Sequence, residues 1–180
     1  TGRTPALVAR NAEAVGLISV ADRPRQTSRD AVDLLRQHGV DAVVMLTGDS
    51  QGTAQAVAAQ VGISDVRAEL MPEDKVAAIE ELRRMYGSVA MVGDGINDAP
   101  ALACADVGIA MGAAGSDAAL ATADVALMSD ELLRVPYALR LSRSTLTNIK
   151  VNLGISLVLK AAFVVKSEER REGKSVLFRS

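Results

Sequence analysis

The sequence predicts an α/β fold with a doubly wound parallel sheet, and three observations carry this prediction. Short apolar runs of strand length alternate with helical patterns along most of the 180 residues. Several of the helical patterns stop at a glycine, which ends helices readily. Polar, glycine-containing segments follow the apolar runs, at the edge where open α/β sheets place their ligands. Aromatic residues make up only 2% of the chain, so small aliphatic side chains must fill the core.

The elements are expected in a regular order. Strands are predicted at 16–20, 42–46, 66–70, 89–92, 107–111 and 125–128. Between them, helices are expected before Gly39, over 53–61, after Pro72, at 100–103 and at 116–121. The third helix should bury Val76, Ile79, Leu82 and Met85, which recur at helical spacing.

Four segments are expected along the chain. Residues 1–131 form the α/β domain, and 132–150 form a connecting helix with basic residues on it. Residues 151–165 are apolar and follow those basic residues, which is typical of the start of a transmembrane helix. Residues 166–180 form a charged tail that cannot continue a membrane span. A soluble core helix with a solvated tail is the alternative, and the first residue, Thr1, suggests a fragment of a longer protein.

Composition excludes several classes of protein. With 20 basic and 22 acidic residues the net charge is −2, so no nucleic-acid-binding surface is implied. The single cysteine, Cys104, excludes an internal disulfide, and the single His38 excludes a zinc site of histidines and cysteines. We interpret Cys104 as a small core residue and His38 as an ordinary last-turn residue.

The segment 89–102 (VAMVGDGINDAPAL) predicts a Mg²⁺ site beside a phosphate. Asp94 follows an apolar strand between two glycines, and Asp98 lies one helical turn further on. Two hard oxygen ligands at a strand end suit Mg²⁺. The alternative is a tight loop whose aspartates cap the next helix.

Two further strand ends carry residues suited to a phosphoryl group. Thr47 offers a hydroxyl and Gly48 a backbone amide, while Asp49 is either functional or a cap for the next helix. Lys75 lies in the first turn of a helix, where a cation opposes the helix dipole, so we expect it to meet an anion. No strand end carries an Asp-Lys-Thr-Gly-like sequence, so the set lacks a nucleophile.

These motifs together resemble the P-type cation-transporting ATPases, of the haloacid-dehalogenase-like superfamily. The resemblance rests on 47–49 (TGD), 71–75 (MPEDK) and 93–102 (GDGINDAPAL), and it extends over about 2–165. It implies that 1–131 is the C-terminal part of the phosphorylation domain and that 22–25 (DRPR) is its hinge to the nucleotide domain. The phosphorylated aspartate and most of the ATP pocket would lie upstream.

The resemblance also assigns roles to single residues. Thr47 and Lys75 would contact the aspartyl phosphate, with Gly48 and Asp49 in the same loop. Asp94 and Asp98 would hold Mg²⁺, and Asn97 would complete the site. ATP and Mg²⁺ are therefore the implied cofactors.

Within the family, the chain looks like the zinc/cadmium/lead pumps. Segments 115–119 (GSDAA) and 123–128 (ADVALM) resemble the heavy-metal branch, and Asn152 and Lys160 resemble the zinc/cadmium/lead group. Lys160 would act as a counter-ion near the transported cation, since an ionisable residue in a membrane helix is costly. Ser50, where Asn is usual, and the tail after Val165 depart from the pattern.

The expected function is part of an ATP-driven heavy-metal exporter that works through an aspartyl-phosphate intermediate. Its partners would be the metal cation, ATP bound by the nucleotide domain, and membrane lipid, with the phosphorylation domain in the cytoplasm. A soluble Mg²⁺-dependent phosphatase of the same superfamily and a catalytically incomplete fragment are the alternatives.

Overall fold

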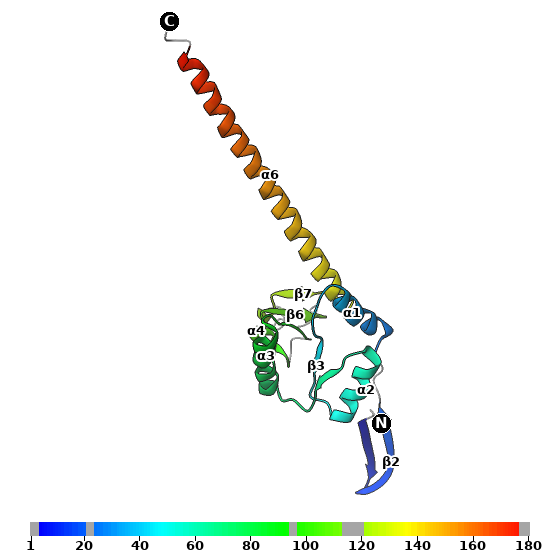
Figure 1. The fold of residues 1–180 in the computed structure, drawn as a ribbon. Coiled ribbons are helices and arrows are strands. Elements are labelled where there is room, and N and C mark those ends of the chain that lie inside the picture. The colour runs from blue at the N-terminus through cyan, green and yellow to red at the C-terminus, as the bar shows by residue number, and fades with distance from the viewer. Residues whose placement is uncertain (1–3, 21–23, 94–96, 113–120, 177–180) are drawn as a thin grey trace. The chain divides into compact units, whose positions relative to one another are not determined.

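The computed structural model describes residues 4–20, 24–93, 97–112 and 121–176. Its elements are β1 (Thr4–Arg10), β2 (Glu13–Val20), α1 (Gln26–Gln37), β3 (Val44–Leu46), α2 (Gln51–Val61), β4 (Asp65–Arg67), α3 (Pro72–Tyr86), β5 (Ala90–Gly93), α4 (Ala99–Cys104), β6 (Val107–Met111), β7 (Val125–Leu127) and α6 (Arg134–Val176). The chain divides into two compact units, Thr1–Pro136 and Tyr137–Ser180 (Figure 1).

The first two strands form an antiparallel hairpin. β1 pairs with β2 in an antiparallel register that joins Arg10 to Glu13. The turn residues Asn11 and Ala12 both have positive φ, at 52° and 66°, which is the backbone conformation of a type I′ hairpin turn. The expected strand at 16–20 is therefore present, but its assignment to the parallel sheet was wrong. An Asn-Ala turn lacks the glycine that usually marks such a hairpin in sequence.

The strands from β3 to β7 pair in parallel, as the sequence predicts. β3 pairs with β4, and the order of the second sheet is β5-β6-β7, of which β6 and β7 are labelled in Figure 1. The helices α2, α3 and α4 connect the strands from β3 to β6 in succession, which is the arrangement of an α/β domain. The expected fold class is confirmed, although the parallel strands form two sheets rather than one. β3 and β5 each lie at an edge of their own sheet among the described residues.

One apolar cluster holds the second sheet to its helices. It consists of Ile79, Met91, Ala101 and Leu102, which are 1–7% exposed. Leu46 of β3 also packs against this cluster, so both parallel sheets share a core. In α3, Ile79 and Leu82 are buried as expected and Val76 packs partly buried against the cluster, whereas Met85, one residue before the end of the helix, is 54% exposed.

Other predictions agree closely with the described elements. β6 has the expected bounds, and α2 ends at Gly62 in the left-handed conformation. β3 and β4 are shorter than expected, at three residues each. The helical turns expected at 116–121 fall mostly outside the described residues.

A salt bridge joins α3 to the loop before β6. The Arg83 guanidinium lies 2.9 Å from the Asp106 carboxylate, which also accepts a hydrogen bond from the Val89 amide. The Val89 amide is the main reason why the pKa of Asp106 is lowered, and Arg83 adds to the effect. This contact anchors the start of β5 beside the start of β6.

We expect Gly108→Ala to destabilise the fold by about 1–3 kcal/mol, the usual cost of overpacking. A Cβ atom on Gly108 would lie 2.7 Å from the carbonyl oxygen of Leu102, and backbone there cannot move aside easily. Urea unfolding of the chain, followed by circular dichroism, measures the effect. Gly52→Ala in the first turn of α2 is the control, since a Cβ atom there meets nothing within 4 Å and the variant should be at least as stable as wild type. Equal stability of Gly108→Ala and wild type would contradict the prediction.

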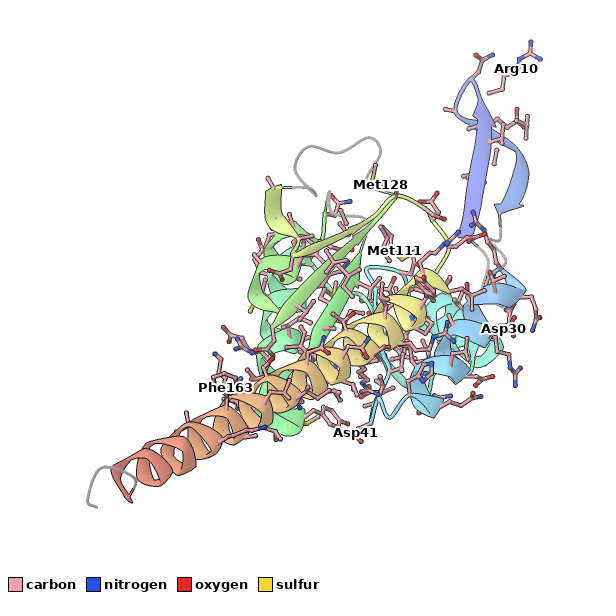
Figure 2. The ribbon with its side chains drawn as sticks, turned by 90° about the horizontal axis from the view of Figure 1, so that it is seen from above. Arg10, Asp30, Asp41, Met111, Met128 and Phe163 are labelled. Carbon is pink, nitrogen blue, oxygen red and sulfur yellow. The ribbon has the colours of Figure 1, made fainter. Side chains whose placement is uncertain are left out.

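The described part of the second unit belongs to one helix, α6. α6 contains one stretch, Arg134–Val164 of 31 residues, that is long and apolar enough to cross a membrane, as judged on the described part of the chain. None of its most apolar window is buried, and Phe163, which projects from the helix in Figure 2, is 79% exposed. The expected start of a transmembrane helix at 151–165 falls within α6. The charged tail continues the same helix to Val176.

Candidate active site

The loop after β3 holds Thr47 through both its backbone and its side chain. The Thr47 hydroxyl accepts a hydrogen bond from the Asp49 amide at 3.1 Å. This bond folds Gly48 and Asp49 back over Thr47. Ser50, not Asp49, is the residue that precedes α2, so the alternative of Asp49 as its N-cap was wrong.

The connection from β4 to α3 packs directly on this loop. The Thr47 amide donates to the Arg67 carbonyl at 3.0 Å, and the Leu70 amide donates to the Thr47 carbonyl at 3.1 Å. A Cβ atom on Gly48 would lie 3.3 Å from the Leu70 carbonyl, so this glycine permits the close approach. Backbone hydrogen bonds on both sides therefore fix the position of Thr47 at the strand end.

The same connection leads into α3 and sets the position of Lys75. Pro72 begins the helix, where its missing N–H costs nothing. The Met71 amide donates to the Asp74 carboxylate at 2.9 Å, and the Lys75 amide donates to the Met71 carbonyl at 3.2 Å. These bonds place Lys75 in the first turn of a well-capped helix.

Lys75 forms an ion pair with Asp98. Its ammonium nitrogen lies 2.5 Å from the Asp98 Oδ1, and the two side chains are 14% and 15% exposed. The anion that we expected beside Lys75 is thus, in this structure, the Asp98 carboxylate. Because the pair is largely shielded from water, its charges interact more strongly than those of a surface pair.

Gly93 allows Asp98 to reach this position. A Cβ atom on Gly93 would lie 2.7 Å from the Asp98 Oδ2 and 2.9 Å from its Cβ. Asp98 precedes α4 without making a side-chain cap of its own, so its carboxylate is directed to Lys75 rather than to the helix amides. Asp98 therefore packs directly against the backbone of Gly93, the last residue of β5.

The Mg²⁺ assignment rests partly on a residue that lies outside the described ones. Asp94 falls in the segment 94–96, whereas Asp98 is described and Asn97 beside it is exposed. A carboxylate oxygen at a strand end is the kind of ligand that Mg²⁺ takes, so the Asp98 side chain fits the ion chemically. The described residues hold no group of three or more His, Cys, Asp or Glu side chains that could bind a metal.

Lys160 lies on the exposed surface of α6, in the second compact unit. The ion pair and the Thr47 loop belong to the first unit. The sequence predicted that Lys75 and Asp98 lie near strand ends, but it did not predict the ion pair between them. It also missed Glu69, whose amide donates a hydrogen bond to the Asp49 carbonyl and whose backbone is left-handed, with φ of +58°, a conformation that no local sequence signal marks.

Comparisons with known proteins give matches along most of the chain. Residues 1–106 match the family model described as haloacid dehalogenase-like hydrolase. A probable cadmium-transporting ATPase of Alkalihalophilus pseudofirmus is 52% identical over 88% of this chain and 22% of that protein. A manganese-exporting P-type ATPase of Mycobacterium bovis is 50% identical over the same shares. The chain thus spans about a fifth of the length of these curated relatives.

A solved structure is similar along nearly the whole chain. The crystal structure of a zinc-transporting PIB-type ATPase in the E2·Pi state superposes with a TM-score of 0.79 and 43% sequence identity. The match covers 92% of this chain and 27% of that one. The resemblance to heavy-metal P-type ATPases is therefore confirmed in sequence and in fold.

Proposed function

Because the chain belongs to the haloacid dehalogenase-like hydrolase family, we propose that it is the phosphoryl-transfer part of an ATP-driven heavy-metal exporter. The ion pair between Lys75 and Asp98 carries this proposal. It holds a cation at a strand end of an α/β domain, where a phosphoryl group would need its charge neutralised. The relatives named above transport or export cadmium, manganese and zinc. For this chain we propose Zn²⁺, Cd²⁺ or Pb²⁺ as the cargo.

The residues of the site would act by binding and orienting the phosphoryl group. The Thr47 hydroxyl accepts a bond from the Asp49 amide, which leaves its own proton to donate to a phosphoryl oxygen. The Lys75 ammonium neutralises charge on the transferring group, and Asp98 keeps that ammonium in place. Mg²⁺, when bound by Asp94 and Asp98, supplies further positive charge to the phosphoryl oxygens. Asn97 would add a hydrogen bond beside it.

We further propose that a strand from outside residues 1–180 brings the phosphorylated aspartate. β3 and β5 lie at sheet edges while Leu46 of β3 packs on the core that contains Met91 of β5. Edge strands present unpaired backbone groups that can pair with another strand. A strand added there would end beside Thr47 and Gly93. This arrangement supports a division of the active site between this chain and the rest of the exporter.

The helix α6 supports a position at the cell membrane, with the phosphorylation domain in the cytoplasm. Its candidate span carries Lys160 and has basic residues before its most apolar part. Positive residues beside a span favour the cytoplasmic side. Lys160 would then serve as a counter-ion near the transported cation, and lipid would cover the exposed apolar surface of the helix.

We expect the full-length ATPase that contains residues 1–180 to hydrolyse ATP faster when Zn²⁺, Cd²⁺ or Pb²⁺ is added. Purified enzyme in lipid is assayed for phosphate release and for an acid-stable phosphoenzyme labelled from γ-³²P-ATP. The 180-residue chain alone is the control and should form no phosphoenzyme, because it lacks the acceptor aspartate. Stimulation by Mn²⁺ alone would overturn the proposal that the transported ion is Zn²⁺, Cd²⁺ or Pb²⁺. Absence of any phosphoenzyme would overturn the proposed mechanism through an aspartyl phosphate. A phosphoenzyme on the isolated chain would favour the soluble phosphatase instead.

A further inference from the structure

Glu69 has a backbone conformation that is unusual for its residue type. Its φ is +58°, in the left-handed region, where a residue with a Cβ atom is strained. Glycine or asparagine would occupy this position at lower cost. Strain of this kind persists only where surrounding contacts maintain it, and it concentrates at functional sites. The contacts of Glu69 therefore indicate what the strained conformation maintains.

Glu69 contacts the loop that carries Thr47 at two points. Its amide donates a hydrogen bond to the Asp49 carbonyl at 2.9 Å. Its side-chain Oε1 accepts one from the Gln51 amide at 3.4 Å, in the first turn of α2. The left-handed backbone lets one residue present its amide and its carboxylate to the same loop. Glu69 thus holds the loop on both sides of Ser50.

The glutamate side chain replaces a cap that α2 otherwise lacks. Ser50 precedes the helix but makes no side-chain cap, and its hydroxyl pairs with the Thr53 hydroxyl at 3.1 Å. A carboxylate near the first helix amides is favoured by the helix dipole. The side chain therefore gives a reason for glutamate at a position where backbone preference alone favours glycine.

Leu70, the residue after Glu69, also bonds to the Thr47 loop. The Leu70 amide donates to the Thr47 carbonyl, so residues 69 and 70 together bind the loop at its start and its end. Residues 71–75 follow directly and carry Lys75 into the ion pair with Asp98. One short connection thus touches the Thr47 loop and leads into the helix of Lys75.

We propose that Glu69 is a positioning residue that fixes the position of the Thr47 loop relative to Lys75, through its amide bond to Asp49 and its carboxylate bond to Gln51. Glu69 touches no reacting group itself and acts through Thr47. The proposal rests on the proposed function, since the position of the loop affects activity only if Thr47 binds a phosphoryl group.

The test compares Glu69→Ala, Glu69→Gly and Glu69→Gln in the full-length ATPase. We measure kcat, the KM for ATP and inhibition by orthovanadate, an analogue of the transferring phosphoryl group. A displaced loop should lower kcat and weaken orthovanadate inhibition by about ten-fold in the Ala and Gly variants, with the KM for ATP unchanged. Glu69→Gln keeps the acceptor and should stay within about two-fold of wild type. Glu80→Ala, an exposed glutamate of α3, is the matched control.

Hydrogen exchange gives a readout that does not depend on activity. Amides of residues 48–51 should exchange faster in the Ala and Gly variants than in wild type or Glu69→Gln. Glu69→Gly lacks the left-handed strain, so it carries the comparison if Glu69→Ala folds poorly. Wild-type kinetics or exchange in Glu69→Gly would overturn the proposal. If the proposed function is wrong, the wild-type enzyme shows no metal-stimulated activity. The hydrogen-exchange comparison then still decides whether Glu69 positions the loop.

Discussion

We expect Lys75→Met in the full-length ATPase to slow phosphoenzyme formation by roughly a hundred- to a thousand-fold, the usual cost of removing one preorganised charge from a transition state. Two losses combine in this variant. The phosphoryl group loses a cation, and the Asp98 carboxylate loses its partner at 2.5 Å. Methionine keeps the unbranched apolar stem of lysine and lacks the ammonium group, so packing at the start of α3 changes little.

Rapid-quench measurement of phosphoenzyme from labelled ATP checks this prediction. Arg84→Met is the control, because Arg84 lies on the same helix and is exposed, with its guanidinium bonded to the Glu80 carbonyl. It should form phosphoenzyme at the wild-type rate. A Lys75→Met enzyme within three-fold of wild type, roughly 0.7 kcal/mol of barrier, would show that Lys75 is only a structural partner of Asp98.

The second large effect is expected for Gly93→Ala. The new Cβ atom would lie 2.9 Å from the Asp98 Cβ, so rotation of the carboxylate alone cannot relieve the contact. Asp98 must shift as a whole, and the ion pair with Lys75 must lengthen or break. A displacement of about 1 Å in a positioned group costs up to a hundred-fold in rate. We therefore expect kcat to fall by roughly ten- to a hundred-fold.

The measurement is again metal-stimulated ATP hydrolysis, now with Mg²⁺ titrated as well. The apparent affinity for Mg²⁺ should fall together with kcat, since Asp98 is a proposed ligand. Gly52→Ala adds the same methyl group at an open site and should leave both values unchanged. If Gly93→Ala keeps its Mg²⁺ affinity while kcat falls, Asp98 acts on Lys75 alone and is not a ligand of the ion.

Sequence patterns predicted the parallel strands well because each combines an apolar run with a nearby polar or glycine boundary. The bounds of β6 and the end of α2 at Gly62 are examples. The same patterns could not predict how strands pair. β2 has the composition of a buried parallel strand, yet it pairs antiparallel with β1 through a turn of Asn11 and Ala12. Pairing depends on the neighbouring chain and on turn geometry, which composition does not encode.

In the candidate site, too, the sequence predicted which residues take part but not the contacts between them. Strand-end position and residue type were enough to select Thr47, Lys75 and Asp98, since each lies where a parallel sheet presents its ligands. The ion pair depends on the approach of α4 to β5 over Gly93, which is a packing result. Glu69 depends on a left-handed backbone that its own side chain disfavours, so no propensity argument would select it.

The β1–β2 hairpin has a consequence for the behaviour of the chain in solution. Leu7, Val8 and Val15 are 41–68% exposed on it. A two-stranded sheet with apolar side chains in water is marginally stable and offers free strand edges for association with other chains. Self-association of isolated chains through these edges would grow with protein concentration. The isolated chain is therefore prone to association at these edges, so its urea unfolding should be measured on dilute samples at two protein concentrations.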